Sequence, residues 1–286
     1  MAEILIVWPW FGWLFALFIG LCFGSFGNVV IARLPKMMQA QWQRDCAELN
    51  NSKTSEQPVY NLAQPASHCP RCKTPIRWYD NIPVLSYLLL RGKCRACNAS
   101  IAIRYPLVEV FCAFLAAITI YHFGFNTLGW SYVVLLYLLV LLTLIDVDHM
   151  LLPDQITLPL LWLGLIGSIF WLPVTPADAI IGAAVGYLFL WSLFWLFKLA
   201  TGKEGMGYGD FKLLAALGAW LGWQHLPLII LLSSVVGACF GILQLVAKNT
   251  RFGQPMPFGP YLAIAGGISL YFGDVIYAWY WSIAIS

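Results

Sequence analysis

Apolar stretches long enough to cross a lipid bilayer recur along the whole chain. A membrane-spanning helix needs about 20 predominantly apolar residues. Eight stretches approach that length: about 10–32, 105–123, 130–146, 155–172, 177–199, 210–222, 226–247 and 258–284. Only 10% of the residues are charged, whereas roughly a quarter are charged in a soluble domain. The pattern predicts an all-α polytopic membrane protein with about eight transmembrane helices, surrounded by the lipid bilayer.

The basic residues are concentrated in the segments between alternate stretches. Eleven of the sixteen Lys and Arg residues lie between Arg33 and Arg104, and the other five are Lys198, Lys203, Lys212, Lys248 and Arg251. If the N-terminus is outside, eight spans place all sixteen on one side, which the positive-inside rule assigns to the cytoplasm. No basic groove with interleaved aromatic residues is apparent, so no nucleic-acid partner is expected.

The only sizeable polar segment, residues 33–104, carries eleven basic and four acidic residues, a net charge of +7. Residues 37–66 are polar and are predicted to be flexible. Residues 67–104 contain two C-x-x-C pairs, one formed by Cys69 and Cys72 and the other by Cys94 and Cys97, with 21 residues between them. A segment as short as residues 67–104 cannot build a stable apolar core, so a bound metal ion is expected to stabilise it.

The two cysteine pairs have the pattern of a four-thiolate zinc site. Each pair presents two sulfur ligands from one tight turn, and two pairs complete the tetrahedral set that zinc prefers. The alternative is a pair of disulfides or redox motifs, which a cytoplasmic location disfavours. Four thiolates leave no position open for water, so the predicted zinc ion is structural.

Six of the thirteen acidic residues fall at or just inside the predicted cytoplasmic ends of spans: Glu109, Asp146, Asp148, Asp154, Glu204 and Asp210. Ionisable groups beside apolar spans are costly, so each is a candidate for function. Asp146 ends the third stretch. Asp210 begins the sixth, after three glycines in five residues that let a substrate chain approach closely. Two adjacent carboxylates can share a proton, so one can deprotonate a water while the other protonates the leaving amine of a peptide.

Other roles for these carboxylates remain open from the sequence. Asp146 or Asp148 could cap the fourth helix, and Asp210 could cap the sixth at its N-terminus. Asp154, directly after Pro153, is typical of a helix start. Acids within membrane segments also often serve transport rather than catalysis.

Several motifs together resemble the bacterial type IV prepilin peptidases. The first stretch carries Gly24-Ser-Phe-Gly-Asn-Val-Val-Ile-Ala-Arg-Leu-Pro35, close to a G-S-F-x-N-V-V-x-x-R-L-P signature, although Gly27 stands where many members have leucine. Ile145-Asp146 with Leu152-Pro153-Asp154 resembles the first aspartate motif of the family. Gly207-Tyr-Gly-Asp210 resembles its G-x-G-D motif, and Pro257-Phe-Gly-Pro260 resembles the start of its last span. The joint match covers the chain nearly end to end.

The resemblance implies a membrane aspartic endopeptidase with Asp146 and Asp210 as its catalytic pair, at the cytoplasmic face of the bacterial inner membrane. It implies that type IV prepilins and related pseudopilins are the substrates, cleaved after a glycine that follows a basic leader. It also implies N-methylation of the new N-terminal residue with S-adenosyl-L-methionine as methyl donor. The chain has no glycine-rich nucleotide fingerprint, and residues 24–33 with polar and aromatic loop residues are the candidates for that donor's site.

The predicted organisation has three parts: a first transmembrane helix (1–32), a cytoplasmic four-cysteine zinc-binding domain (33–104) and a seven-helix membrane aspartic peptidase domain (105–286). Two other classes of protein compete with this interpretation. A polytopic transporter with a cytoplasmic zinc module would often contain inverted repeats, but no convincing repeat is present. A membrane-anchored binding module would not need eight spans.

Overall fold

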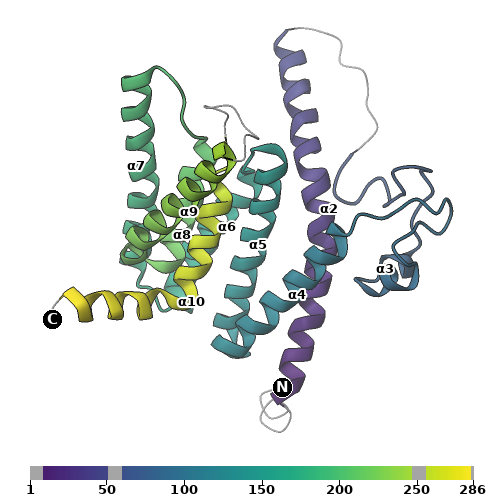
Figure 1. The fold of residues 1–286 in the computed structure, drawn as a ribbon, viewed down its shortest axis with the longest axis horizontal. Helices are drawn as coiled ribbons and strands as arrows, with labels where there is room; N and C mark the ends of the chain where they lie inside the picture. Colours follow the sequence, from purple (N-terminus) through teal and green to yellow (C-terminus); the bar gives the residue numbers. More distant parts are fainter. Residues whose placement is uncertain (1–8, 51–59, 247–255, 285–286) are drawn as a thin grey trace. The chain divides into compact units, whose positions relative to one another are not determined.

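The computed structural model describes residues 9–50, 60–246 and 256–284 (Figure 1). Among these residues there are helices and turns but no β-strand. Eight helices of 14 or more residues coincide with the eight predicted stretches, which confirms the all-α polytopic membrane fold: α2 (Pro9–Leu49), α4 (Arg104–Phe123), α5 (Thr127–His149), α6 (Asp154–Phe170), α7 (Pro176–Thr201), α8 (Tyr208–Leu221), α9 (Leu226–Val246) and α10 (Gly259–Ala284). Three short helical turns lie between them: η1 (Trp78–Asn81), α3 (Leu85–Leu89) and η2 (Trp223–His225).

Not all eight helices are long enough to cross a bilayer alone. Six are sufficiently long and apolar: α2, α4, α5, α7, α9 together with η2, and α10. α6 has 17 residues and α8 has 14. At about 1.5 Å per residue, α8 rises only about 21 Å, less than the roughly 30 Å thickness of the hydrocarbon core.

Helix α2 is much longer than the apolar stretch that predicts it. It has 41 residues, contains Pro35, and ends at Leu49. The prediction that residues 37–66 are flexible is therefore wrong for residues 37–49, and residues 51–59 of that segment lie outside the described residues. The residues after Pro35 are mostly good helix formers such as Met, Gln, Ala and Glu, and Gln41 donates a hydrogen bond of 2.7 Å to Asp45 one turn later.

The chain forms two compact units, Met1–Tyr137 and Leu138–Ser286. In the first unit α2 and α4 pack closely against each other (Figure 1). A Cβ atom added to Gly20 would lie 2.5 Å from the Cα of Ala113, and one added to Gly24 would lie 2.5 Å from the Cα of Glu109. Because the partner number falls as the α2 number rises, the helices are antiparallel. The G-x-x-x-G spacing lets their backbones approach, as in other membrane helix pairs.

We expect Gly24→Ala to destabilise the first unit. The new methyl group would collide with backbone atoms, so the two helices would have to separate, at a cost of about 1–3 kcal/mol or more. Thermal unfolding of the purified protein in detergent measures the loss. Gly241→Ala in α9 is the matched control, because its Cβ would meet only the flexible end of Met256, at 3.1 Å. Equal melting temperatures for the two variants would contradict the close helix contact.

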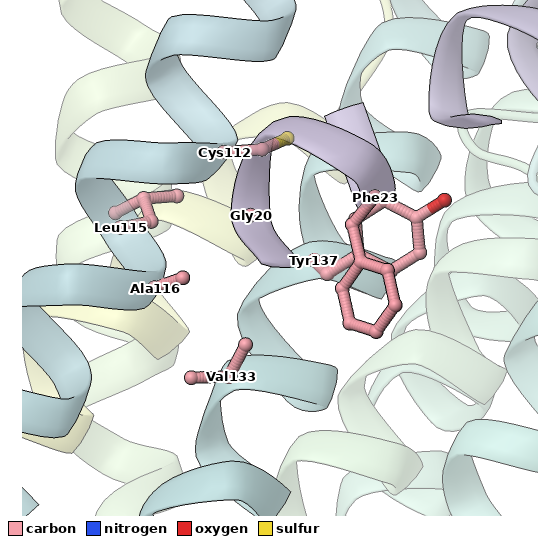
Figure 2. A pocket seen from close by; sticks show the side chains of 7 residues that line it. All are labelled: Gly20, Phe23, Cys112, Leu115, Ala116, Val133 and Tyr137. Atoms are coloured by element: carbon pink, nitrogen blue, oxygen red, sulfur yellow. The ribbon is translucent and has the colours of Figure 1, made fainter. Parts of the chain in front are cut away.

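A small cavity lies beside this helix contact, lined by Gly20, Phe23, Cys112, Leu115, Ala116, Val133 and Tyr137 (Figure 2). Its volume of about 10 Å³ is room for about one water molecule. The Tyr137 ring packs beside Phe23, with ring centroids 5.0 Å apart. The buried Tyr137 hydroxyl has no hydrogen-bond partner in the described part of the chain. The cavity is too small for a peptide or a nucleoside.

In the second unit, the short helix α8 is the buried centre. It contacts α6, α7 and α10, and every residue from Leu213 to its end is buried. α7 and α8 approach closely at a pair of glycines: a Cβ on Gly182 would lie 2.3 Å from the carbonyl oxygen of Gly218, and the reverse distance is also 2.3 Å. α8 can be short because neighbouring helices, rather than lipid, cover its surface.

Candidate active site and metal centre

Asp146 lies in the last turns of α5, with 5% of its surface exposed. Its Oδ2 atom accepts a hydrogen bond of 3.0 Å from the backbone N–H of Gly259, 113 residues further along the chain. Gly259 is the first residue of α10. The first N–H groups of a helix have no partner within it and carry the positive end of the helix dipole, so this position stabilises a carboxylate.

Asp210 is the third residue of α8 and is equally buried, with 6% of its surface exposed. The glycine before it is required by packing: a Cβ on Gly209 would lie 2.6 Å from the Cβ of Leu152. At Gly207 the surroundings are open, because an added Cβ would meet only Asp210 Oδ2 at 3.9 Å and the Gly209 nitrogen at 4.0 Å. A methyl-sized group would therefore fit beside the Asp210 carboxyl group without a clash.

The side chain of Leu152 lies beside backbone positions next to both aspartates. It packs against Gly209, next to Asp210, and also lies 3.0 Å from the position of a Cβ on Gly259, the donor to Asp146. The two carboxyl groups are close enough to interact electrostatically. Three motifs that lie far apart in the sequence thus meet within the second unit.

The structure does not place Asp146 or Asp148 at the start of α6. The residue before α6 is Pro153, and Asp146 and Asp148 both lie within α5, so the capping alternative for these two residues is wrong. Asp210 lies in the first turn of α8, whose N-cap is Gly207, and its carboxyl group interacts with the backbone N–H of that glycine. The predicted position of Asp210 at the N-terminus of this helix is therefore confirmed.

The prediction that Asp154 marks a helix start is confirmed, because α6 begins there. Its carboxyl oxygens accept hydrogen bonds of 2.6 and 2.7 Å from the Nζ atom of Lys212. Lys212 follows Asp210 by two residues in α8. This partly exposed ion pair joins the starts of α6 and α8, and its contribution to stability is about 1 kcal/mol or less.

The four cysteine thiols converge on one point in the first unit. The Sγ atoms of Cys69, Cys72, Cys94 and Cys97 all lie within 4.8 Å of one another, and those of Cys69 and Cys97 are 3.8 Å apart. A tetrahedral zinc site with Zn–S bonds of about 2.3 Å has sulfur–sulfur distances of about 3.8 Å. All four thiols are free, so the disulfide alternative is not realised. The donor set and its spacing fit a zinc ion.

The two cysteine turns have the same backbone geometry. The N–H of Cys69 donates to Thr74 O at 3.0 Å, and that of Cys94 donates to Ala99 O at 2.8 Å. In each turn the residue after the second cysteine has a positive φ: 60° at Lys73 and 55° at Asn98. These repeated turns orient two sulfur atoms each toward the shared centre.

An ion pair ties the second cysteine turn to η1. Arg95 donates from Nε and Nη2 to the two carboxyl oxygens of Asp80, at 2.9 and 2.6 Å. These hydrogen bonds hold the pKa of the Asp80 carboxyl below its usual value. The geometry is the bidentate fork that arginine forms with carboxylates.

The sequence does not indicate the hydrogen-bond partners of two buried carboxylates. Glu109 accepts a hydrogen bond of 2.7 Å from the N–H of Val84, whose φ of +57° is unusual for a β-branched residue. The partner of Asp146 is Gly259, within the motif Pro257-Phe-Gly-Pro260. A glycine just before a proline at a helix start was the only local signal of either contact.

Two family models together match most of the chain. The bacterial peptidase A24 N-terminal domain matches residues 18–123, and the type IV leader peptidase family matches residues 133–242. The first match covers the cysteine cluster and Glu109. The second contains Asp146 and Asp210.

Proteins named prepilin leader peptidase/N-methyltransferase are similar to the chain over most of its length. The protein from Pseudomonas aeruginosa is 56% identical over 259 residues, which cover 90% of this chain and 89% of the relative. The protein from Aeromonas salmonicida is 53% identical over 280 residues, 96% of this chain and 95% of the relative. The protein from Burkholderia pseudomallei is 45% identical over 266 residues, 92% and 86% of the two chains. No solved structure matches the chain. With both halves of the chain matched and relatives of this identity along most of its length, the protein belongs to the type IV leader peptidase family.

Proposed function

We propose that this protein cleaves the leader peptide of type IV prepilins and related pseudopilins, and then N-methylates the residue that cleavage exposes. The observation that carries the peptidase proposal is the buried pair Asp146 and Asp210, brought together from motifs on α5 and α8. The names of the close relatives support both activities.

In this proposal the two carboxyl groups divide the work of peptide hydrolysis. One is ionised and takes a proton from a water molecule, whose oxygen adds to the scissile carbonyl. The other is protonated and donates its proton to the leaving amine, because two adjacent carboxylates do not both ionise readily. The substrate chain approaches the pair on the side of Gly207, where no side chain stands beside the Asp210 carboxyl group, and cleavage follows a glycine at the end of a basic leader.

We assign a structural zinc ion to Cys69, Cys72, Cys94 and Cys97. When bound, it supplies folding energy to a segment that has almost no apolar core of its own. Four thiolate ligands leave no position for a substrate, so the zinc has no direct part in hydrolysis. S-adenosyl-L-methionine is the proposed methyl donor, in keeping with the name of the relatives.

We retain the three predicted parts of the chain as functional divisions: the first transmembrane helix (1–32), the zinc-binding domain (33–104) and the peptidase domain (105–286). The first helix extends beyond the first division, since α2 ends at Leu49. We propose that the protein lies in the bacterial inner membrane, with the zinc segment and both aspartates on the cytoplasmic side.

This topology predicts that both termini are periplasmic. All sixteen basic residues then lie on the cytoplasmic side, as the positive-inside rule requires. Reporter fusions at Lys53 and at the C-terminus measure the sides directly: the first should be active as a cytoplasmic reporter and the second as a periplasmic one. Cytoplasmic activity at the C-terminus would contradict the eight-helix topology.

A cleavage assay tests the proposed function. The purified protein in detergent is mixed with a prepilin that carries its leader, and the product is resolved on a gel and by mass spectrometry. We expect a single cut after the glycine of the leader, followed by a mass increase of one methyl group when the donor is added. A transporter with a zinc module would leave the prepilin intact, and that result would refute the proposal.

A further inference from the structure

Arg33 is a buried cation near the end of the apolar part of α2. Only 9% of its surface is exposed. The groups that contact its guanidinium are neutral: Nη1 donates to the carbonyl oxygens of Asn61 at 3.1 Å and Leu62 at 3.3 Å, and the guanidinium lies 6.0 Å from the centroid of the Tyr60 ring. Within the described ranges, no acidic side chain forms an ion pair with it.

The segment that contacts Arg33 is a preformed turn. The Asn61 side-chain oxygen accepts hydrogen bonds from the N–H groups of Ala63 at 2.8 Å and Gln64 at 2.6 Å, and the Asn61 N–H donates to Gln64 O at 2.8 Å. The turn therefore satisfies its own amides and leaves the carbonyls of Asn61 and Leu62 directed at Arg33. These contacts fix one nitrogen of the guanidinium and the orientation of the whole planar group.

The guanidinium keeps one accessible edge. Its Nε and Nη2 atoms form no hydrogen bond within the described residues, and they are not among the fully buried atoms there that lack a partner, so a further group can reach them. Charged groups that are largely buried are normally paired, since desolvation is costly. A guanidinium has five N–H donors in a fixed fork, and only its Nη1 atom is used by the turn. The edge formed by Nε and Nη2 has the geometry that binds a carboxylate or phosphate with two parallel hydrogen bonds.

We propose that Arg33, oriented by the turn at residues 60–64, binds the carboxylate of the amino-acid end of S-adenosyl-L-methionine. The inference rests on the proposed methyltransferase function and adds a residue to it. The site lies in the first unit, within the region that matches the N-terminal family model. Asp146 and Asp210 belong to the second unit, so the residue that we propose for binding the methyl donor is distinct from the peptidase pair. Tyr60, whose exposed fraction is 38%, adds an aromatic surface beside the guanidinium.

A comparison of two ligands on one protein tests this assignment. S-adenosyl-L-homocysteine retains the carboxylate, and its decarboxylated form retains the amine, the sulfur and the adenosine but not the anion. Binding of both is measured by calorimetry on the purified full-length protein in a detergent without phosphate groups. We expect the wild-type protein to bind the carboxylate ligand about 10- to 100-fold more tightly, as a charge-assisted pair should.

Arg33→Gln should remove most of this discrimination, while affinity for the decarboxylated ligand changes little. The ratio of the two affinities comes from a single preparation, so a partly unfolded fraction does not affect it. Arg33→Lys, which retains the charge but not the fork, should give an intermediate ratio. Arg44→Gln is the matched control, since Arg44 is an exposed arginine on the same helix, and it should retain the wild-type ratio.

Three results would overturn the assignment. If Arg33→Gln retains the wild-type ratio, or loses both ligands equally, Arg33 only holds the turn in place. If phosphatidylglycerol stabilises the wild-type protein but not Arg33→Gln, and the ligand ratio is unchanged, the anion is a lipid phosphate. If the wild-type protein binds neither adenosyl ligand and transfers no methyl group, the proposed methyltransferase function itself fails.

Discussion

Asp210→Asn and Asp146→Asn should each lower the rate of leader cleavage by at least about a thousandfold, the order of effect that a positioned acid or base has on proton transfer. Asparagine has nearly the same shape as aspartate but can neither accept the proton of a water nor deliver one to a leaving amine. Both side chains are buried in the second unit, and an amide at Asp146 can still accept the Gly259 N–H through its oxygen. The purified variants should therefore remain folded, and single-turnover cleavage of a prepilin measures the loss.

Two matched variants show whether this effect is specific. Asp148→Asn changes an exposed carboxyl group two residues from Asp146, and Asp154→Asn weakens the ion pair with Lys212. Both should be milder. Methylation of a peptide that has already been cleaved should continue in the Asp146 and Asp210 variants, because methyl transfer does not use the pair. Cleavage by Asp210→Asn at the wild-type rate, or an essential Asp148 beside a dispensable Asp146, would contradict the assignment.

Replacing any one of the four clustered cysteines by serine should release the metal and unfold residues 67–104. The binding energy of a structural zinc is also folding energy, so the segment loses both together. Elemental analysis of protein purified without chelator should give about one zinc per wild-type chain and much less for Cys69→Ser. Limited proteolysis should then cut the segment rapidly, while part of the leader cleavage survives because the aspartates belong to the other unit.

Cys46→Ser is the control for this experiment. Cys46 is an exposed cysteine on α2 and is not a member of the cluster, so its replacement should leave the zinc content unchanged. Wild-type protein without zinc, or zinc retained fully by Cys69→Ser, would rule out the four-thiolate site.

The positions of the helices along the chain follow closely from hydropathy, and the exceptions are the lengths of α2 and α8. Hydropathy underestimates the length of α2 because the residues after Pro35 are polar, although most of them favour helix. Helix α8 is shorter than a typical membrane span for a different reason. Its apolar residues are covered by α6, α7 and α10, so it does not need the length that a lipid-exposed span requires.

The cysteine cluster and the two aspartates were also visible in the sequence, because each lies in a compact motif. Their partners were not. The bond from Gly259 to Asp146 crosses 113 residues, and the bond from Val84 to Glu109 depends on a strained backbone that no propensity favours. The contacts of Arg33 are similarly non-local: the turn that faces it comes 28 residues later and is held by an asparagine with no distinctive pattern around it.

The proposed hydrolysis depends above all on the pairing of Asp146 with Asp210, and a double variant tests this pairing most directly. When two residues act together in one catalytic step, replacing either one abolishes that step. Replacing the second residue then lowers the cleavage rate little further. Single-turnover cleavage of a purified prepilin should therefore be as slow, within about tenfold, in Asp146→Asn/Asp210→Asn as in either single variant. A double variant whose loss equals the product of the two single losses would show that the carboxyl groups act independently, and would contradict the pair.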